Sequence, residues 1–223
     1  MKPNRKLAET TTPDGARLIL YEHDGTYCIR LNEQELMNSK IAASELLLGE
    51  LVVGRLPAQS DSCILIGGLG LGFTLKTVLN RVGAKATIEV AELIPQVVDW
   101  NREFLSHLNG TLLDDSRVKV FVEDVWDVIA RAGRSRYDAI VLDVDNGPTA
   151  MVQKQNARLY QQNGLQRIAS ALKPGGRAAF WSARPDPAFA NQLAKAGLKV
   201  ELVPAKTYAN AKRSAYTIYL ADK

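Results

Sequence analysis

The sequence predicts an α/β protein: a seven-stranded β-sheet, mostly parallel with an antiparallel last strand, preceded by a small β-meander. Three observations support this prediction. From residue 62 onward, short apolar runs alternate with helix-length segments, which is typical of a parallel sheet with helices on both faces. A glycine-rich turn at residues 67–72 follows the first of these runs. The last two runs are joined by the short segment 204–214, so the final strand can turn back antiparallel.

The N-terminal segment predicts the β-meander. Residues 1–16 are mostly polar and contain prolines, so we expect a loose arm there. Asp24-Gly25 is a strong hairpin signal between two strand-like runs. Leu36-Met37 indicates a third strand. The strands predicted for the meander are 18–21, 27–31 and 36–37.

Apolar residues at helical spacing predict a helix over residues 40–54. We therefore divide the chain near residue 40, into a meander region, 1–39, and a main domain, 40–223. Each strand expected in the main domain is a short, largely apolar run: 63–66, 87–91, 118–122, 138–143, 177–182, 198–203 and 215–220. The helices expected between them are 71–82, 95–108, 125–132, 156–172 and 187–196.

The glycine turn predicts a binding site. Glycine lets the backbone approach a ligand closely, and the first N–H groups of the following helix point toward that ligand. The turn lacks the Gly-Lys-Ser/Thr ending of a phosphate-binding loop. Glu92 ends the next strand, twenty residues beyond Gly72, where doubly wound folds place the acid that holds ribose hydroxyls. Together these features favour a nucleoside cofactor, either a dinucleotide or S-adenosylmethionine, over a turn that binds nothing.

Carboxylates follow three successive strands of the predicted sheet. Glu92 ends the second strand, Asp124 follows the third, and Asp143 and Asp145 follow the fourth. Because the carboxyl ends of parallel strands meet at one edge of a sheet, we expect these acids to surround the glycine turn. Asp124 alone would fit a helix N-cap equally well. A cluster of carboxylates repels phosphates and attracts cations, so it disfavours a dinucleotide and favours a sulfonium or amine ligand.

Composition narrows the functional classes. With 46% hydrophobic and 23% charged residues, the 223-residue chain is typical of a globular protein. Its net charge is +4, but it has no long lysine or arginine tract, so we expect no nucleic-acid partner. The two cysteines and two histidines lack metal-ligand spacing, and we expect no metal. No apolar run reaches membrane-spanning length and no signal peptide is evident, so we expect a cytoplasmic protein without a membrane partner.

Several motifs are shared with one known family. An aspartate-rich stretch at residues 137–148 ends in Gly-Pro, and Lys-Pro-Gly-Gly follows at residues 173–176. Residues 21–25 and 36–39 fit the N-terminal meander of the same family. Over nearly its whole length, the chain resembles the spermidine synthase (polyamine aminopropyltransferase) family. The resemblance implies the class I S-adenosylmethionine-dependent methyltransferase fold, with a Rossmann-like sheet.

The resemblance also implies a function. Family members move an aminopropyl group from decarboxylated S-adenosylmethionine to a small-molecule amine, a reaction of polyamine biosynthesis. A methyltransferase that uses S-adenosylmethionine itself is the alternative, and a non-catalytic nucleoside-binding homologue is a further one. Family members commonly pair through the meander, so the resemblance implies a homodimer, with residues 1–39 as the oligomerisation region and residues 40–223 as the catalytic domain.

Site residues follow from the resemblance by position. Glu92 would hold the ribose hydroxyls and Asp124 the adenine amino group, with Val125 stacked against the base. Asp143 would lie beside the aliphatic tail of the cofactor and act in catalysis with Asp145, the acid that receives the attacking amine; Asn146 is the alternative for that position. The turn glycines that would bind the cofactor are Gly67, Gly68, Gly70 and Gly72.

Two departures from the family pattern keep the alternatives open. The family carries an aspartate in its glycine turn that binds the cofactor amine, and the matching position here is Gly70. The family's diamine-binding stretch would fall near residues 40–50, where this chain has Glu45 and Glu50 but no histidine or tyrosine. Asp143 and Asp145 still suit a tail that bears only an amine, since they repel one that also carries a carboxylate.

Overall fold

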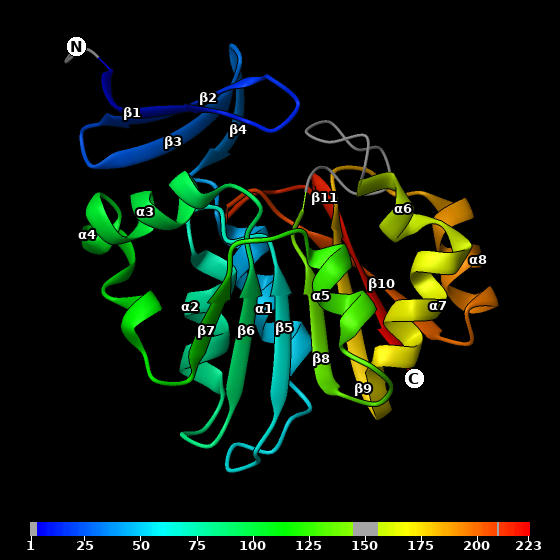
Figure 1. Ribbon diagram of the computed structural model, residues 1–223. Helices are drawn as coiled ribbons and strands as arrows, with labels where there is room; N and C mark the ends of the chain where they lie inside the picture. The colour runs from blue at the N-terminus through cyan, green and yellow to red at the C-terminus, as the bar shows by residue number, and fades with distance from the viewer. Residues whose placement is uncertain (1–3, 145–155, 209) are drawn as a thin grey trace.

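The computed structural model describes residues 4–144, 156–208 and 210–223, and this part of the chain forms two β-sheets (Figure 1). The first is a four-stranded antiparallel meander in the order β1-β2-β3-β4. Asp24 and Gly25 form the tight turn between β2 and β3, both with positive φ, as the hairpin signal predicts. The meander strands are β1 (Arg5–Thr11), β2 (Arg17–His23), β3 (Thr26–Leu31) and β4 (Gln34–Asn38).

The expectation of a loose arm over residues 1–16 is wrong, because β1 occupies much of that segment and pairs with β2. The pairing register shifts between Lys6 and Ala8, which breaks the strict alternation by which a strand is recognised in sequence. As an edge strand with most of its residues exposed, β1 also tolerates polar residues such as Glu9, which pairs with Arg17. A polar composition therefore concealed this strand.

The second sheet has seven strands in the order β10-β11-β9-β8-β5-β6-β7. Its strands are parallel except β11, which runs antiparallel to both β9 and β10, so the predicted fold class is confirmed. The strands are β5 (Cys63–Gly67), β6 (Thr87–Ala91), β7 (Val118–Phe121), β8 (Tyr137–Leu142), β9 (Leu172–Ser182), β10 (Lys199–Ala205) and β11 (Tyr216–Asp222).

The helices lie on both faces of this sheet (Figure 1). Two segments predicted as single helices, 95–108 and 156–172, are each broken into two. The second break follows from Gly164, where a Cβ would lie 2.2 Å from the carbonyl oxygen of Arg158, so the two pieces pack too closely for any side chain. The helices are α1 (Ala43–Val53), α2 (Phe73–Arg81), α3 (Pro95–Glu103), α4 (Ser106–Asn109), α5 (Val125–Arg131), α6 (Ala157–Tyr160), α7 (Gln162–Ala171) and α8 (Pro187–Lys195).

Strand β5 shows how the core is divided. Ile64 and Ile66 pack on the face covered by α1, α2 and α3, whereas Leu65 packs on the face covered by α5, α7 and α8. All three side chains are fully buried, which explains the uninterrupted apolar run in the sequence. Figure 1 shows the meander above the edge at which β5, β6 and β8 end. Within the described ranges, no helix is both long and apolar enough to cross a bilayer.

Candidate nucleoside-binding site

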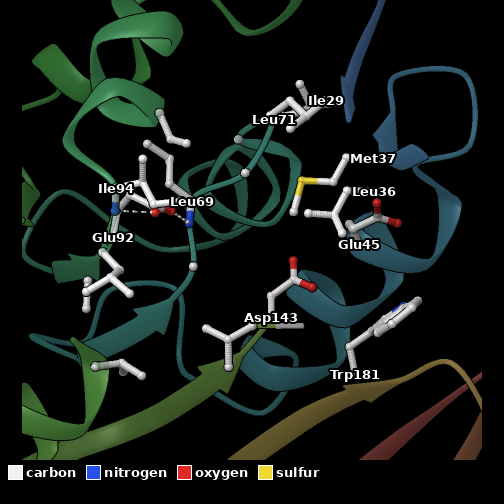
Figure 2. Close-up of a pocket in the computed structure, with 18 of the residues that line it drawn as sticks. Ile29, Leu36, Met37, Glu45, Leu69, Leu71, Glu92, Ile94, Asp143 and Trp181 are labelled. Atoms are coloured by element: carbon white, nitrogen blue, oxygen red, sulfur yellow. Dashed lines mark hydrogen bonds between the residues drawn. The ribbon is translucent and has the colours of Figure 1, made fainter. Parts of the chain in front are cut away.

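A pocket with a cavity volume of about 160 Å³ lies at the carboxyl ends of the central strands (Figure 2). Its floor is the glycine turn between β5 and α2. One side is formed by the residues that follow β6 and β8 and by the start of α5. The other side is formed by α1 and by the meander, so both sheets contribute to it.

The glycine turn brings the ends of two strands into contact. At Gly68, with φ +89°, a Cβ would lie 2.4 Å from the carbonyl oxygen of Asp143, so only glycine permits this approach. Gly70 and Gly72 line the pocket with Gly68. Gly67 does not line it: the last residue of β5 is buried against Val125 and Leu142.

The carboxylate of Glu92 accepts hydrogen bonds from the glycine turn and from the residue before α3. One carboxylate oxygen accepts the N–H of Leu69 at 2.9 Å, and the other accepts the N–H of Ile94 at 2.9 Å (Figure 2). The residue is 8% exposed, and burial raises the pKa of Glu92 while backbone N–H donors oppose that rise. The carboxylate thus joins the glycine turn to the start of α3 and presents acceptor oxygens to one end of the pocket.

Asp124 and Val125 line the pocket at the start of α5. Asp124 is the N-cap of this helix: one oxygen accepts the Trp126 N–H at 2.8 Å, and the other accepts the Arg158 guanidinium at 2.7 Å. Arg158 also lies 4.9 Å above the Trp126 ring, with Arg167 on the same ring. The N-cap interpretation and the pocket-lining position both hold for Asp124.

Asp143 directly follows β8 and enters the other end of the pocket (Figure 2). The Thr74 hydroxyl donates to it at 2.8 Å. Burial, and then the charge of Glu45, raise the pKa of Asp143 from 3.8 to about 7. Its predicted catalytic partner, Asp145, lies outside the described residues.

Glu45 is the acid of this site that sequence reasoning did not associate with Asp143. It lies in the first turn of α1, lines the pocket, and faces Asp143 across it (Figure 2). Burial raises the pKa of Glu45, against a hydrogen bond from the Ser44 hydroxyl. No local pattern distinguishes Glu45 from Glu50 on the same helix, so its place in the pocket had no signal in the sequence.

The meander also lines the end of the pocket that contains Glu45 and Asp143. Leu36 and Met37 of β4 project beside the glycine turn, and Trp181 at the end of β9 lines the pocket near Glu45 (Figure 2). A Cβ at Gly70 would lie 2.6 Å from the Met37 sulfur. Met37 therefore occupies the space into which a side chain at position 70 would project.

The arrangement suits an uncharged nucleoside with a cationic tail. Acceptor oxygens lie at one end and apolar side chains along the middle. At the other end are two carboxylates, Glu45 and Asp143, with which no described lysine, arginine or histidine forms an ion pair. In the described ranges, no group of three or more His, Cys, Asp or Glu residues could hold a metal ion.

The Glu92 contacts give a direct prediction. Glu92→Gln retains only one acceptor oxygen for two buried N–H groups, so we expect about 1–3 kcal/mol lower stability together with weaker binding of adenosine-type nucleosides. Thermal unfolding and calorimetric titration with neutral 5′-methylthioadenosine measure the two effects. Glu103→Gln, an exposed position on α3, is the matched control. Unchanged nucleoside affinity in Glu92→Gln would contradict the assigned role.

Known proteins resemble this chain in sequence. The family model described as the spermine/spermidine synthase domain matches residues 50–193. The polyamine aminopropyltransferase of Mycobacterium tuberculosis (strain ATCC 25618 / H37Rv) is 32% identical over 124 residues, which cover 54% of this chain and 23% of that protein. The matched stretch therefore spans about a quarter of the length of that relative.

Solved structures share the fold over almost the full chain. A spermidine synthase in complex with the transition state analogue AdoDATO superimposes with a TM-score of 0.75 at 18% identity, covering 98% of this chain and 72% of that chain. The spermidine synthase from Thermotoga maritima gives a TM-score of 0.72 at 19% identity, with 98% and 73% covered. At these identities the likeness concerns the fold.

Proposed function

The chain belongs to the spermine/spermidine synthase domain family, and on this premise we propose that it transfers an aminopropyl group from decarboxylated S-adenosylmethionine to a small-molecule amine. Besides family membership, one observation supports the proposal. The pocket ends in two carboxylates, Asp143 and Glu45, that no cation among the described residues neutralises. An ammonium on the ligand tail supplies the missing positive charge.

The proposed reaction is a displacement at carbon. The lone pair of the acceptor nitrogen forms a bond to the propyl carbon attached to the sulfonium, and the carbon–sulfur bond breaks with its electron pair going to sulfur. The products are the aminopropylated amine, 5′-methylthioadenosine and one proton. Because the sulfonium loses its charge, the protein has only to align the amine and take its proton. Asp143, whose carboxylate enters this end of the pocket, is the group proposed to take that proton.

The remaining site residues take the roles predicted for them. In this proposal Glu92 accepts hydrogen bonds from the ribose hydroxyls, and Asp124 accepts one from the adenine amino group beside Val125. Gly68, Gly70 and Gly72 let the backbone approach the nucleoside, while Gly67 acts only through packing. Asp145 is proposed as the acid that receives the attacking amine.

Methyl transfer from S-adenosylmethionine is the second candidate, and Gly70 is the observation that favours it. The glycine turn carries no acid at this position, and Met37 fills the space. A methyltransferase, however, needs a partner for the carboxylate of the intact tail, and the acids at this end of the pocket oppose one.

Product analysis separates the two candidates. The purified protein is incubated with decarboxylated S-adenosylmethionine and a panel of diamines and polyamines, and in parallel with S-adenosylmethionine and the same amines. We expect 5′-methylthioadenosine and an aminopropylated amine to accumulate in the first incubation, detected by mass spectrometry. S-adenosylhomocysteine in the second incubation, with no product in the first, would overturn the proposal in favour of methyl transfer.

We further propose that residues 1–39 form the oligomerisation region of a homodimer, that residues 40–223 form the catalytic domain, and that the protein acts in the cytoplasm. Family resemblance supports these assignments. Light scattering on the full chain tests the dimer, and a monomeric mass would contradict it.

A further inference from the structure

Four carboxylates among the described residues line the pocket, and two of them already have strong partners. Glu92 is held by the backbone N–H groups of Leu69 and Ile94. Asp124 is held by the N–H of Trp126 and by Arg158. Glu45 and Asp143 remain, and their partners are different in kind.

In the part of the chain that the structure describes, Glu45 and Asp143 have neutral partners, a hydroxyl for each and the backbone N–H of Glu45 itself, and no cation. Ser44 donates to Glu45, and Thr74 donates to Asp143. No lysine, arginine or histidine of the described residues forms an ion pair with either acid. Two carboxylates that repel each other in a poorly solvated place are unfavourable unless a cation joins them or one of them binds a proton.

The residues around Glu45 and Asp143 offer a cation no other described anion at this end of the pocket. Figure 2 shows Leu36 and Met37 on one side of Glu45 and the indole of Trp181 on the other, so largely apolar side chains flank this acid. Gly70 offers no side chain there, and Met37 fills the adjacent space. A positively charged tail that enters this end of the pocket therefore meets Glu45 and Asp143 as its nearest described anions.

We propose that Glu45 is the specificity-determining residue for the donor: with Asp143 it holds the ammonium of a tail that lacks a carboxylate, and it rejects a tail that carries one. This inference rests on the proposed function and names the residue that selects the donor. An amino-acid tail brings its own carboxylate toward the two acids, so the same pair that attracts an ammonium repels the intact methionine tail.

Binding of an ammonium-bearing donor should be linked to the protonation of Glu45 and Asp143. Burial raises the pKa of both acids, so near neutral pH the unliganded pair is partly protonated. An ammonium favours the ionised carboxylates, and its binding should expel the bound proton. The affinity for an ammonium-bearing donor should therefore rise with pH through about pH 7, where Asp143 ionises. Among the residues that the structure describes, the hydroxyl of Tyr216 on β11 also interacts with Glu45, and Glu35 and Tyr208 lie near that tyrosine; none of the three carries a positive charge.

Calorimetric titration with three nucleosides tests the proposal. The ligands are decarboxylated S-adenosylmethionine, S-adenosylmethionine and neutral 5′-methylthioadenosine, applied to the wild type and to Glu45→Gln. We expect Glu45→Gln to lower the affinity for the decarboxylated donor by about tenfold or more, as for loss of a charge-assisted contact, and to leave 5′-methylthioadenosine binding unchanged. Glu50→Gln, an exposed position on the same helix, should retain the wild-type preference.

A second measurement uses the wild type alone and does not depend on the folding of a variant. Titrations at pH 7 in buffers of different ionisation enthalpy report the protons released on binding. Decarboxylated S-adenosylmethionine should release a fraction of a proton, and 5′-methylthioadenosine should release none. Equal proton release by the two ligands would overturn the proposal.

The outcomes separate this inference from the proposed function. A wild type that forms aminopropylated product, with a Glu45→Gln variant that still prefers the decarboxylated donor, overturns the role of Glu45 alone. A wild type that binds 5′-methylthioadenosine but prefers intact S-adenosylmethionine overturns both. Loss of the preference in Glu45→Gln, with retained 5′-methylthioadenosine binding, supports the inference.

Discussion

Replacing Asp143 by asparagine is expected to lower kcat for aminopropyl transfer by about 10²–10⁴-fold, the contribution typical of a positioned acid–base group. Asparagine keeps the shape of the side chain and can still accept the hydrogen bond from Thr74, but it cannot take a proton from the attacking amine. The binding of neutral 5′-methylthioadenosine should persist, because that ligand has no ammonium. Steady-state kinetics and titration of the variant measure the two effects.

Asp143→Asn is also expected to change how the stability of the protein depends on pH. The pKa of Asp143 rises from 3.8 to about 7 on folding, so the folded state holds a proton that the unfolded chain has released. Stability is therefore lost as pH rises from about 4 toward 7, and asparagine removes this loss. At pH 8 the unliganded Asp143→Asn protein should unfold at the same temperature as the wild type or higher. Asp127→Asn, exposed on α5, should change neither activity nor stability. A full-activity Asp143→Asn variant would contradict the catalytic assignment.

Gly68→Ala is expected to destabilise the fold by about 2–4 kcal/mol and to abolish nucleoside binding. The added Cβ would lie 2.4 Å from the carbonyl oxygen of Asp143, a backbone atom at the end of β8 that cannot move without disturbing the central sheet. The alanine would also adopt φ near +89°, a conformation that L-residues rarely take. Urea denaturation gives the loss of stability, and titration with 5′-methylthioadenosine gives the loss of binding.

Gly197→Ala is the matched control for Gly68→Ala. Gly197 has φ +85°, close to that of Gly68, but a Cβ there would meet nothing within 4 Å. Its substitution should cost about 1–2 kcal/mol, the backbone term alone, and leave nucleoside binding unchanged. Equal destabilisation by the two substitutions would show that the close approach to Asp143 adds no cost.

The fold could be predicted because its signals are local. Strand β5 is fully buried from Ile64 to Ile66, and such strands appear in sequence as short apolar runs between glycines and polar segments. Strand β1 gave no such signal, since it is an exposed edge strand with an irregular register. The break between α6 and α7 was equally hidden, because it depends on how closely the backbone at Gly164 approaches that at Arg158.

Some residues of the candidate site could likewise be predicted from local signals, and others could not. Glu92, Asp124 and Asp143 could be predicted, since each follows a parallel strand and the topology brings strand ends together. Glu45 and Met37 could not, because they reach the pocket from α1 and β4. Their positions depend on how α1 packs against α2 and how the meander lies over the glycine turn, which no local pattern records.

Residues of both β-sheets line the pocket, and this has a thermodynamic consequence. Leu36 and Met37 belong to the first sheet, whereas the glycine turn and Glu92 adjoin strands of the second, so a nucleoside bound as proposed would contact both. Ligand binding and the association of the two sheets are then linked, and each must strengthen the other by the same free energy. A substitution that loosens the meander, however far from the nucleoside, weakens binding by the factor by which the nucleoside stabilises the meander. In the proposed complex, the ligand is thus part of the interface that holds the two sheets together.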